Sequence, residues 1–161
     1  MLSDIKKYDR EHIFDAINSQ PNQLRDNYAD SMGEDITAQD GVGIDNIVVV
    51  GMGGSALAGS IIKNWLYERL KVPFEQVRGS TLPGYVNRRT LVIISSYSGD
   101  TAETLQAYSE ARKYNCPTIC VTNGGQLLKS SQKDHTTALI LPKVSQPRLA
   151  VFACLKAIAC V

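Results

Sequence analysis

The chain has 161 residues, of which 43% are hydrophobic and 20% are charged, and these proportions are those of one ordinary globular α/β domain. Seventeen basic and sixteen acidic residues leave a net charge of +1, so there is no electrostatic basis for binding nucleic acid or an anionic membrane. No run approaches the ~20 apolar residues of a membrane span, and the residues from Met1 to Lys7 do not resemble a signal peptide.

The cysteines predict buried thiols rather than a metal site. The chain has 4 Cys and 2 His, and no two cysteines form a C-x-x-C pair. Cys120 lies in an apolar run and Cys154 lies on an amphipathic helix, where a thiol packs as a small hydrophobic group. We therefore expect no bound metal and a reduced, cytoplasmic protein.

The first part of the chain predicts a helical arm and a linker, residues 1–43. A first helix is expected from Tyr8 to Ser19, because apolar residues recur at helical spacing until Pro21. A second helix is expected from Gln23 to Met32. The polar, glycine-containing stretch from Gly33 to Gly43 then reads as the linker to the main domain.

From residue 44 to residue 161, predicted strands and helices alternate. The apolar, β-branched runs predict five strands at Asn46–Val50, Phe74–Val77, Thr90–Ser95, Thr118–Thr122 and Ala138–Leu141. Helical patterns follow at residues 55–70, 101–114 and 126–132, and a last helix is expected to start near Pro147. Such alternation predicts an α/β fold, a three-layer α/β/α sandwich around a five-stranded parallel sheet.

Two loops rich in glycine and hydroxyl groups follow the first and third predicted strands. They are Gly51–Ser55 and Ser95–Thr101, and each opens into a helix. The first N–H groups of a helix lack backbone partners, and the helix dipole favours an anion there. Glycine allows close approach of the backbone, and hydroxyl groups add donors. Because strand C-termini of a parallel sheet share one edge, the two loops predict one crevice that binds a phosphorylated ligand.

Other interpretations of these loops remain open. The residues Gly51, Gly53 and Ala56 match a dinucleotide fingerprint, which calls for an acidic residue at the end of the second strand; the sequence there is Val77-Arg78. Plain helix capping could explain Ser98 or Thr101 alone. We interpret Asp100 and Glu103 as carboxylates that stabilise a helix start, not as a catalytic pair.

In order and spacing, several segments resemble the SIS (sugar isomerase) domain family, with its flavodoxin-like fold. Within that family the resemblance is to bifunctional phosphoglucose/phosphomannose isomerases. It rests on the Gly51–Ser55 loop, the stretches SSYSGDTAET and CPTICVTNGG, Gln146-Pro147-Arg148 and the Pro21–Leu24 stretch of the arm. The resemblance implies that Ser96, Ser98 and Thr101 bind the sugar phosphate and that Gly53, Gly54 and Ser55 line the sugar. It implies that Arg148 is catalytic and stabilises the charge of a cis-enediolate, a role that a fixed guanidinium suits.

The implied activity is the reversible isomerisation of glucose 6-phosphate or mannose 6-phosphate to fructose 6-phosphate, without a cofactor. Family members join two SIS halves, and the catalytic base and the ring-opening histidine come from the second; His12 and His135 match neither position. The sequence therefore reads as the first half of such an enzyme. The alternative is a stand-alone SIS module that binds or senses a hexose 6-phosphate without catalysis.

The C-terminal segment Leu149–Val161 predicts an apolar helix without a capping glycine or a polar end. An apolar helix of this kind is expected either to be covered in an oligomer or to pack against further chain. We therefore predict a homodimer.

Overall fold

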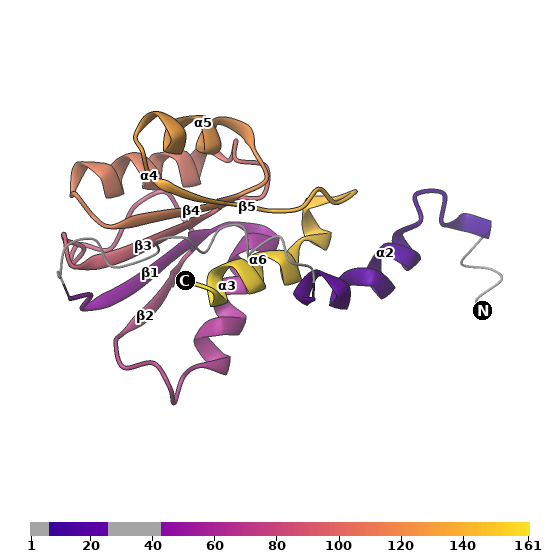
Figure 1. Ribbon diagram of the computed structural model, residues 1–161, viewed down its shortest axis with the longest axis horizontal. Coiled ribbons are helices and arrows are strands. Elements are labelled where there is room, and N and C mark those ends of the chain that lie inside the picture. Colours follow the sequence, from indigo (N-terminus) through magenta and orange to yellow (C-terminus); the bar gives the residue numbers. More distant parts are fainter. Residues whose placement is uncertain (1–6, 26–42) are drawn as a thin grey trace.

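The computed structural model describes residues 7–25 and 43–161, and its centre is a parallel sheet of five strands (Figure 1). The strands lie in the order β2-β1-β3-β4-β5 and all neighbouring pairs are parallel. Their bounds are Asn46–Gly51 (β1), Phe74–Val77 (β2), Thr90–Ser95 (β3), Thr118–Thr122 (β4) and Thr137–Ile140 (β5). The five predicted strands are confirmed, with shifts of one residue at the C-terminal end of β1 and at both ends of β5.

Helices cover both faces of the sheet, which confirms the three-layer architecture (Figure 1). On one face lie α3 (Gly53–Trp65) and α6 (Val151–Ala159), and on the other lie α4 (Ala102–Lys113) and α5 (Gly125–Lys133). The residues of β1 alternate between the two layers, because successive side chains of a strand point to opposite faces. Val49 packs with the α3 and α6 side, whereas Val48 and Val50 pack with the α4 and α5 side.

Helices α3, α4 and α5 start within two residues of the predictions, and two other helix starts differ more. In the arm, α2 (Ile13–Ser19) begins later than Tyr8, because the carboxylate of Asp9 accepts hydrogen bonds from the N–H groups of Ile13 and Phe14, both at 2.8 Å. Asp9 thereby caps the helix at Ile13. The last helix starts with a separate 3-10 turn, η4 (Pro147–Leu149), before α6 begins.

The ends of α4 and α5 are shifted by one residue, and larger differences occur at the end of α3 and after α2. Helix α3 ends at Trp65, before a turn, rather than at Leu70. Pro21 does not end the arm: the chain continues in a 3-10 helix, η1 (Gln20–Leu24), in whose first turn proline is tolerated since no backbone N–H is needed there. Of the predicted second helix, Gln23–Met32, the first two residues belong to η1. Its part from residue 26 on and the predicted linker up to residue 42 lie outside the described residues.

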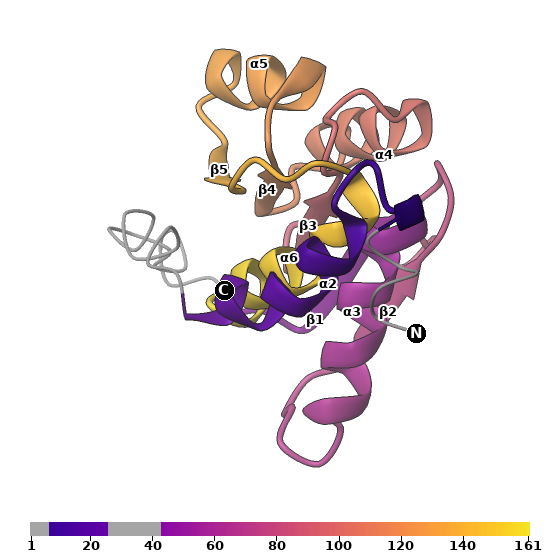
Figure 2. The ribbon, with the colours of Figure 1, turned by 90° about the vertical axis from the view of Figure 1, so that its right-hand side faces the viewer.

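The main contact between the described part of the arm and the domain is made by η1. The 3-10 helix η1 packs against α6, and α2 extends from there past the edge of the sheet (Figures 1 and 2). This contact makes neighbours of Gln23 and Leu149, which are more than 120 residues apart in the sequence. This contact brings the arm next to the segment that carries Arg148.

The C-terminal helix buries its apolar side inside the chain. Ala153, Cys154, Leu155, Ala157 and Ile158 of α6 are buried against α3 and the sheet. This packing explains why Lys156 is the one charged residue of the helix. The helix therefore does not need a second chain to cover it, which removes the main reason for predicting a homodimer from this segment.

Three of the four cysteines are buried, including Cys120 and Cys154 as predicted, and all four are free thiols. Burial raises the pKa of Cys120 to about 12 and that of Cys154 to about 11, so both stay protonated at neutral pH. Protonated thiols are poor nucleophiles and poor metal ligands. These two residues act as small apolar groups of the core.

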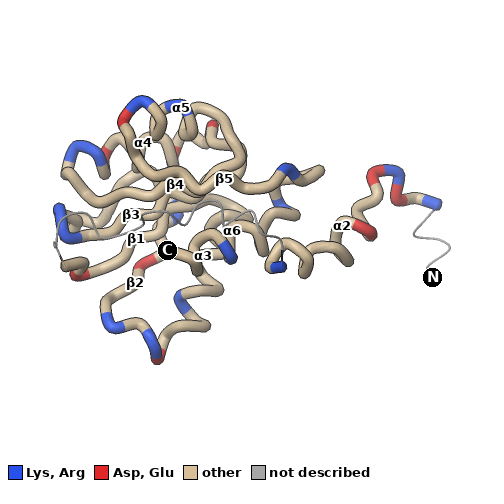
Figure 3. Tube along the Cα trace, in the orientation of Figure 1, with Lys and Arg blue, Asp and Glu red and all other residues tan. Residues whose placement is uncertain are grey.

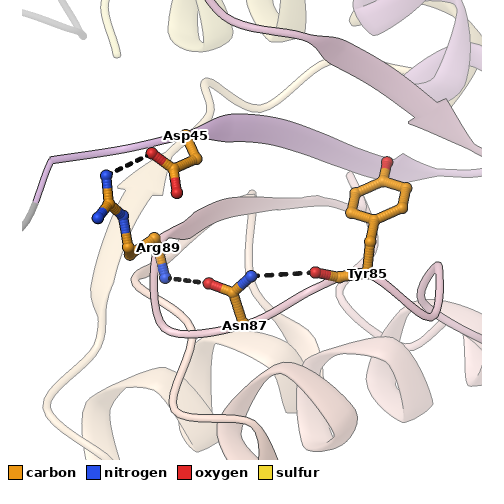
Figure 4. Close-up of polar contacts among 4 residues, drawn as sticks. All are labelled: Asp45, Tyr85, Asn87 and Arg89. Atoms are coloured by element: carbon orange, nitrogen blue, oxygen red, sulfur yellow. Dashed lines mark hydrogen bonds and ion pairs between the residues drawn. The ribbon is translucent and has the colours of Figure 1, made fainter.

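Charged residues lie mainly on helices and turns, whereas β1, β3, β4 and β5 carry none (Figure 3). At the N-terminal end of β3, the guanidinium of Arg89 pairs with Asp45 at 2.5 Å, and Asn87 links the Arg89 N–H to the Tyr85 carbonyl (Figure 4). These contacts tie the starts of β1 and β3 together, at the edge opposite the predicted crevice. No helix in the described part of the chain is long and apolar enough to cross a membrane.

Candidate functional site

The candidate site lies where the strand order of the sheet reverses. After β1 the chain adds β2 on one side, and β3 then pairs with β1 on the other side, so that the ends Gly51 and Ser95 are register partners. Helix α3 leaves β1 toward one face and α4 leaves β3 toward the other (Figure 1). A crevice must open between the two loops, and in parallel α/β sheets this is the usual position of a ligand.

A cavity of about 340 Å³ occupies this position. Every residue that was predicted for the site lines it: Gly53, Gly54, Ser55, Ser96, Ser98, Thr101 and Arg148. Four more lining residues were not predicted, namely Met52, Ser95, Tyr97 and Pro147. They are chain neighbours of predicted residues, and the only signal that could have found them is this adjacency.

The loop after β3 orders its hydroxyl groups through its own contacts. The Ser96 hydroxyl donates to Thr101 Oγ1 at 3.1 Å and accepts the Gly99 N–H at 3.2 Å. The Ser98 hydroxyl is exposed and accepts the Asp100 N–H at 3.3 Å. Thr101 is the N-cap of α4 but forms no side-chain capping bond, so its hydroxyl does not occupy the helix start. The three hydroxyl groups thus surround a helix N-terminus that is open to an anion.

The neighbouring loop between β4 and α5 supports this arrangement. The Leu127 N–H donates to the Gly99 carbonyl at 2.8 Å, and the Asn123 N–H donates to the Tyr97 carbonyl at 2.9 Å. The carboxylate of Asp100 accepts the Gln126 N–H at 2.8 Å. Asp100 therefore has the structural role that we expected, but it caps α5 rather than its own helix.

The loop after β1 brings the backbone to the other wall of the cavity. Gly53 has a φ of +53°, and a Cβ built on it would meet no heavy atom within 4 Å, so this backbone faces open space. Met52, the N-cap of α3, makes no side-chain capping bond. Gly54 lies against the 3-10 helix η4, since its Cβ position is 3.6 Å from Arg148 Cα. Ser55 is nearly buried, at 8% exposure.

Arg148 supplies the positive charge of the site. It is the middle residue of η4, it is exposed, and it is the only charged residue among those that line the cavity. Within residues 7–25 and 43–161, no carboxylate forms an ion pair with its guanidinium. An unpaired guanidinium beside two helix N-termini makes the cavity suited to an anion.

The described lining contains no carboxylate and no imidazole that could act as a general base. His12 and His135 are both exposed and lie outside the cavity lining. No group of three or more His, Cys, Asp or Glu side chains that could hold a metal ion occurs in the described part of the chain.

The end of β2 does not offer the carboxylate that a dinucleotide site would use. Glu75 accepts a hydrogen bond from the Tyr85 hydroxyl, and Arg78 donates to the Ser60 hydroxyl at 3.2 Å. The second loop, moreover, shares the cavity with the first. A ribose-binding acidic residue is therefore missing at the position where the dinucleotide interpretation requires one.

The fold and the site define a parallel α/β domain with a cavity at the ends of β1 and β3, and comparison with known proteins identifies its family. The model of the SIS domain family matches residues 43–158, so the chain belongs to the SIS domain family. The chain is similar to a bifunctional phosphoglucose/phosphomannose isomerase of Caldicellulosiruptor bescii, with 36% identity over 86% of this chain and 41% of that protein. It is also similar to the bifunctional phosphoglucose/phosphomannose isomerase of Aquifex aeolicus, with 38% identity over 73% of this chain and 37% of that protein.

Solved structures agree on the fold. The C-terminal domain of glucosamine-fructose-6-phosphate aminotransferase from Francisella tularensis superposes with a TM-score of 0.70 and 23% identity, covering 96% of this chain and 48% of that one. The chain spans about two fifths of the length of the two curated relatives described above.

Proposed function

We propose that this chain binds the phosphate of a hexose 6-phosphate at the start of α4, through Ser96, Ser98 and Thr101. The sugar then extends along Gly53, Gly54 and Ser55 toward Arg148. One observation carries the proposal: both loops and Arg148 line a single cavity whose only charged side chain is cationic. Two helix N-termini, hydroxyl donors and a guanidinium together select an anion with hydroxyl groups attached.

We further propose that the reaction is an aldose–ketose isomerisation, which interconverts glucose 6-phosphate or mannose 6-phosphate with fructose 6-phosphate. Relatives of similar sequence are named bifunctional phosphoglucose/phosphomannose isomerases. Moving a carbonyl between C1 and C2 needs no net oxidant or reductant, and it places negative charge on two oxygens of a cis-enediolate. Arg148 is placed at the cavity, where a guanidinium stabilises that charge without being consumed.

A second candidate is a sugar-phosphate-binding module without catalysis. It is favoured by the described lining, which has no carboxylate or imidazole to remove the C2 proton. The two candidates share the binding step and differ only in turnover. Binding and turnover must therefore be measured separately.

The binding step is tested with fructose 6-phosphate and the variant Ser98→Ala. We expect the wild-type chain to bind this ligand in isothermal titration calorimetry, and the variant to bind it about 5- to 150-fold more weakly, which is the cost of one unpaired ligand oxygen. The control is Ser109→Ala, which removes an exposed hydroxyl on α4 without touching the cavity.

Two results would contradict the proposal. One is equal binding by wild type and Ser98→Ala. The other is a melting temperature that rises with NAD or NADP but not with fructose 6-phosphate, because a ligand stabilises only the state that binds it.

The homodimer also remains a prediction, although α6 is covered within the chain. Exposed apolar side chains occur on α3 instead, where Leu57 is 46% and Trp65 is 62% exposed. They lie eight residues apart, close to one face of the helix. We expect sedimentation velocity to show a dimer at tens of micromolar, weakened by Trp65→Ser; a monomer at that concentration would argue against it.

A further inference from the structure

We propose that Gln23 of the N-terminal arm is a positioning residue that fixes Arg148 at the cavity. This inference rests on the proposed function, because it assigns a role to the arm in presenting the catalytic guanidinium. Arg148 needs such support, since it lies in a 3-10 helix of three residues. So short a helix is not stable on its own.

The side-chain amide of Gln23 bonds to both sides of the junction between η4 and α6. Its Nε2 donates to the Leu149 carbonyl at 2.8 Å, and its Oε1 accepts the Ala153 N–H at 3.0 Å. Leu149 and Ala153 are four residues apart, the spacing of an α-helical hydrogen bond. The amide therefore bridges the carbonyl and the N–H that a continuous α-helix would join directly.

The helix axis breaks at this point. Ala150, between η4 and α6, has φ −92° and ψ 11°, outside α-helical geometry. A side chain inserted into the hydrogen-bond ladder is a recognised cause of such breaks. Since Leu149 is 5% exposed and Ala153 is fully buried, solvent cannot easily replace the amide. Gln23 thus stabilises the break, and Arg148 lies two residues before Ala150.

Two other contacts hold the same segment on the N-terminal side of Arg148. Gln146 Nε2 donates to the Glu11 carboxylate of the arm at 2.8 Å. Upstream, the Tyr97 hydroxyl of the cavity accepts the Val144 N–H at 2.7 Å. On the C-terminal side of Arg148, Gln23 contacts this segment with two hydrogen bonds. The connection from β5 to α6 is thereby anchored before and after Arg148.

The test uses Gln23→Met, which keeps the length of the side chain and removes both hydrogen bonds. The matched control is Gln126→Met, the same change at an exposed position of α5 that does not line the cavity. Two ligands are compared by calorimetry: inorganic phosphate, and the 5-phosphate of a five-carbon aldonic acid. The carboxylate of the second ligand imitates the two enediolate oxygens and so reports contact with Arg148.

We expect Gln23→Met to weaken binding of the aldonic acid phosphate by about 5- to 50-fold, since the contact with Arg148 is displaced. Its affinity for inorganic phosphate should stay within about twofold of the wild-type value, since the phosphate loop is unchanged. In an Arg148→Ala background, Gln23→Met should have no further effect, because two residues that act through one contact are not additive. Equal losses for both ligands, or additive losses in the double variant, would overturn the proposal.

A measurement without ligand separates this inference from the proposed function. Amide hydrogen exchange at Ala153, followed by NMR, should accelerate in Gln23→Met and remain unchanged in Gln126→Met. Unchanged exchange in Gln23→Met would overturn the positioning role. If the wild-type chain bound neither ligand, the proposed function would fail, and the exchange rate alone would decide whether Gln23 holds the junction.

Discussion

Replacing Gly99 with alanine is expected to destroy the phosphate-binding loop. Gly99 has a φ of +73°, and a Cβ placed on it would lie 1.8 Å from the Gly124 carbonyl oxygen and 2.9 Å from Thr122 Oγ1. The left-handed backbone and the collision each oppose the substitution, and together they should cost about 2–5 kcal/mol of folding free energy. To relieve the collision, the loop must move away from the β4–α5 loop that supports it.

Urea denaturation measures the stability of Gly99→Ala, and calorimetry measures its affinity for fructose 6-phosphate, which we expect to fall by about 100-fold or more because Ser98 and Thr101 are displaced together. The matched control is Gly84→Ala. Gly84 has no atom within 4 Å of its Cβ position and no positive φ. Its replacement should change stability by about 0.5 kcal/mol or less. If Gly99→Ala bound the ligand like the wild type, the assignment of this loop to the phosphate would be wrong.

We expect the isolated chain to isomerise hexose 6-phosphates slowly, and any activity that it has to depend on Arg148. Without a carboxylate or imidazole in the described lining, the rate should fall about 10²–10⁴-fold below that of an enzyme with a positioned base. Conversion of fructose 6-phosphate to glucose 6-phosphate, coupled to a dehydrogenase, measures this rate. Arg148→Ala should remove what activity remains, because the enediolate then loses its counter-charge.

Binding separates the role of Arg148 from that of the phosphate loop. Arg148→Ala should weaken binding of the aldonic acid phosphate by about 1.5–3 kcal/mol, the value of a charge-assisted hydrogen bond. The affinity for inorganic phosphate should remain nearly unchanged. Arg69→Ala, at an exposed position outside the cavity, is the control. Robust isomerisation by the isolated chain would show that a base exists within it. Glu103, in the first turn of α4, would then be the first residue to test.

The strands and the two loops could be predicted from the sequence because they depend on local patterns. The limits of β3 and β4 follow from β-branched runs bounded by turn residues, and the start of β2 follows from Pro73. All three strands agree with the structure to the residue. In a parallel sheet, the ends of these strands lie on one edge. Applied to the order of strands and helices, that rule predicts that the Gly51–Ser55 and Ser95–Thr101 loops lie together, and residues of both loops line one cavity.

Only the tertiary structure decided which partners the remaining groups find. Asp100 caps α5 instead of α4, and the apolar side of α6 is buried within the chain instead of in an interface. Gln23 reaches Leu149 and Ala153 across more than 120 residues. A carboxylate, an apolar face or an amide has the same sequence signature whatever group it contacts. Its partner is set by packing between distant segments, which no local pattern encodes.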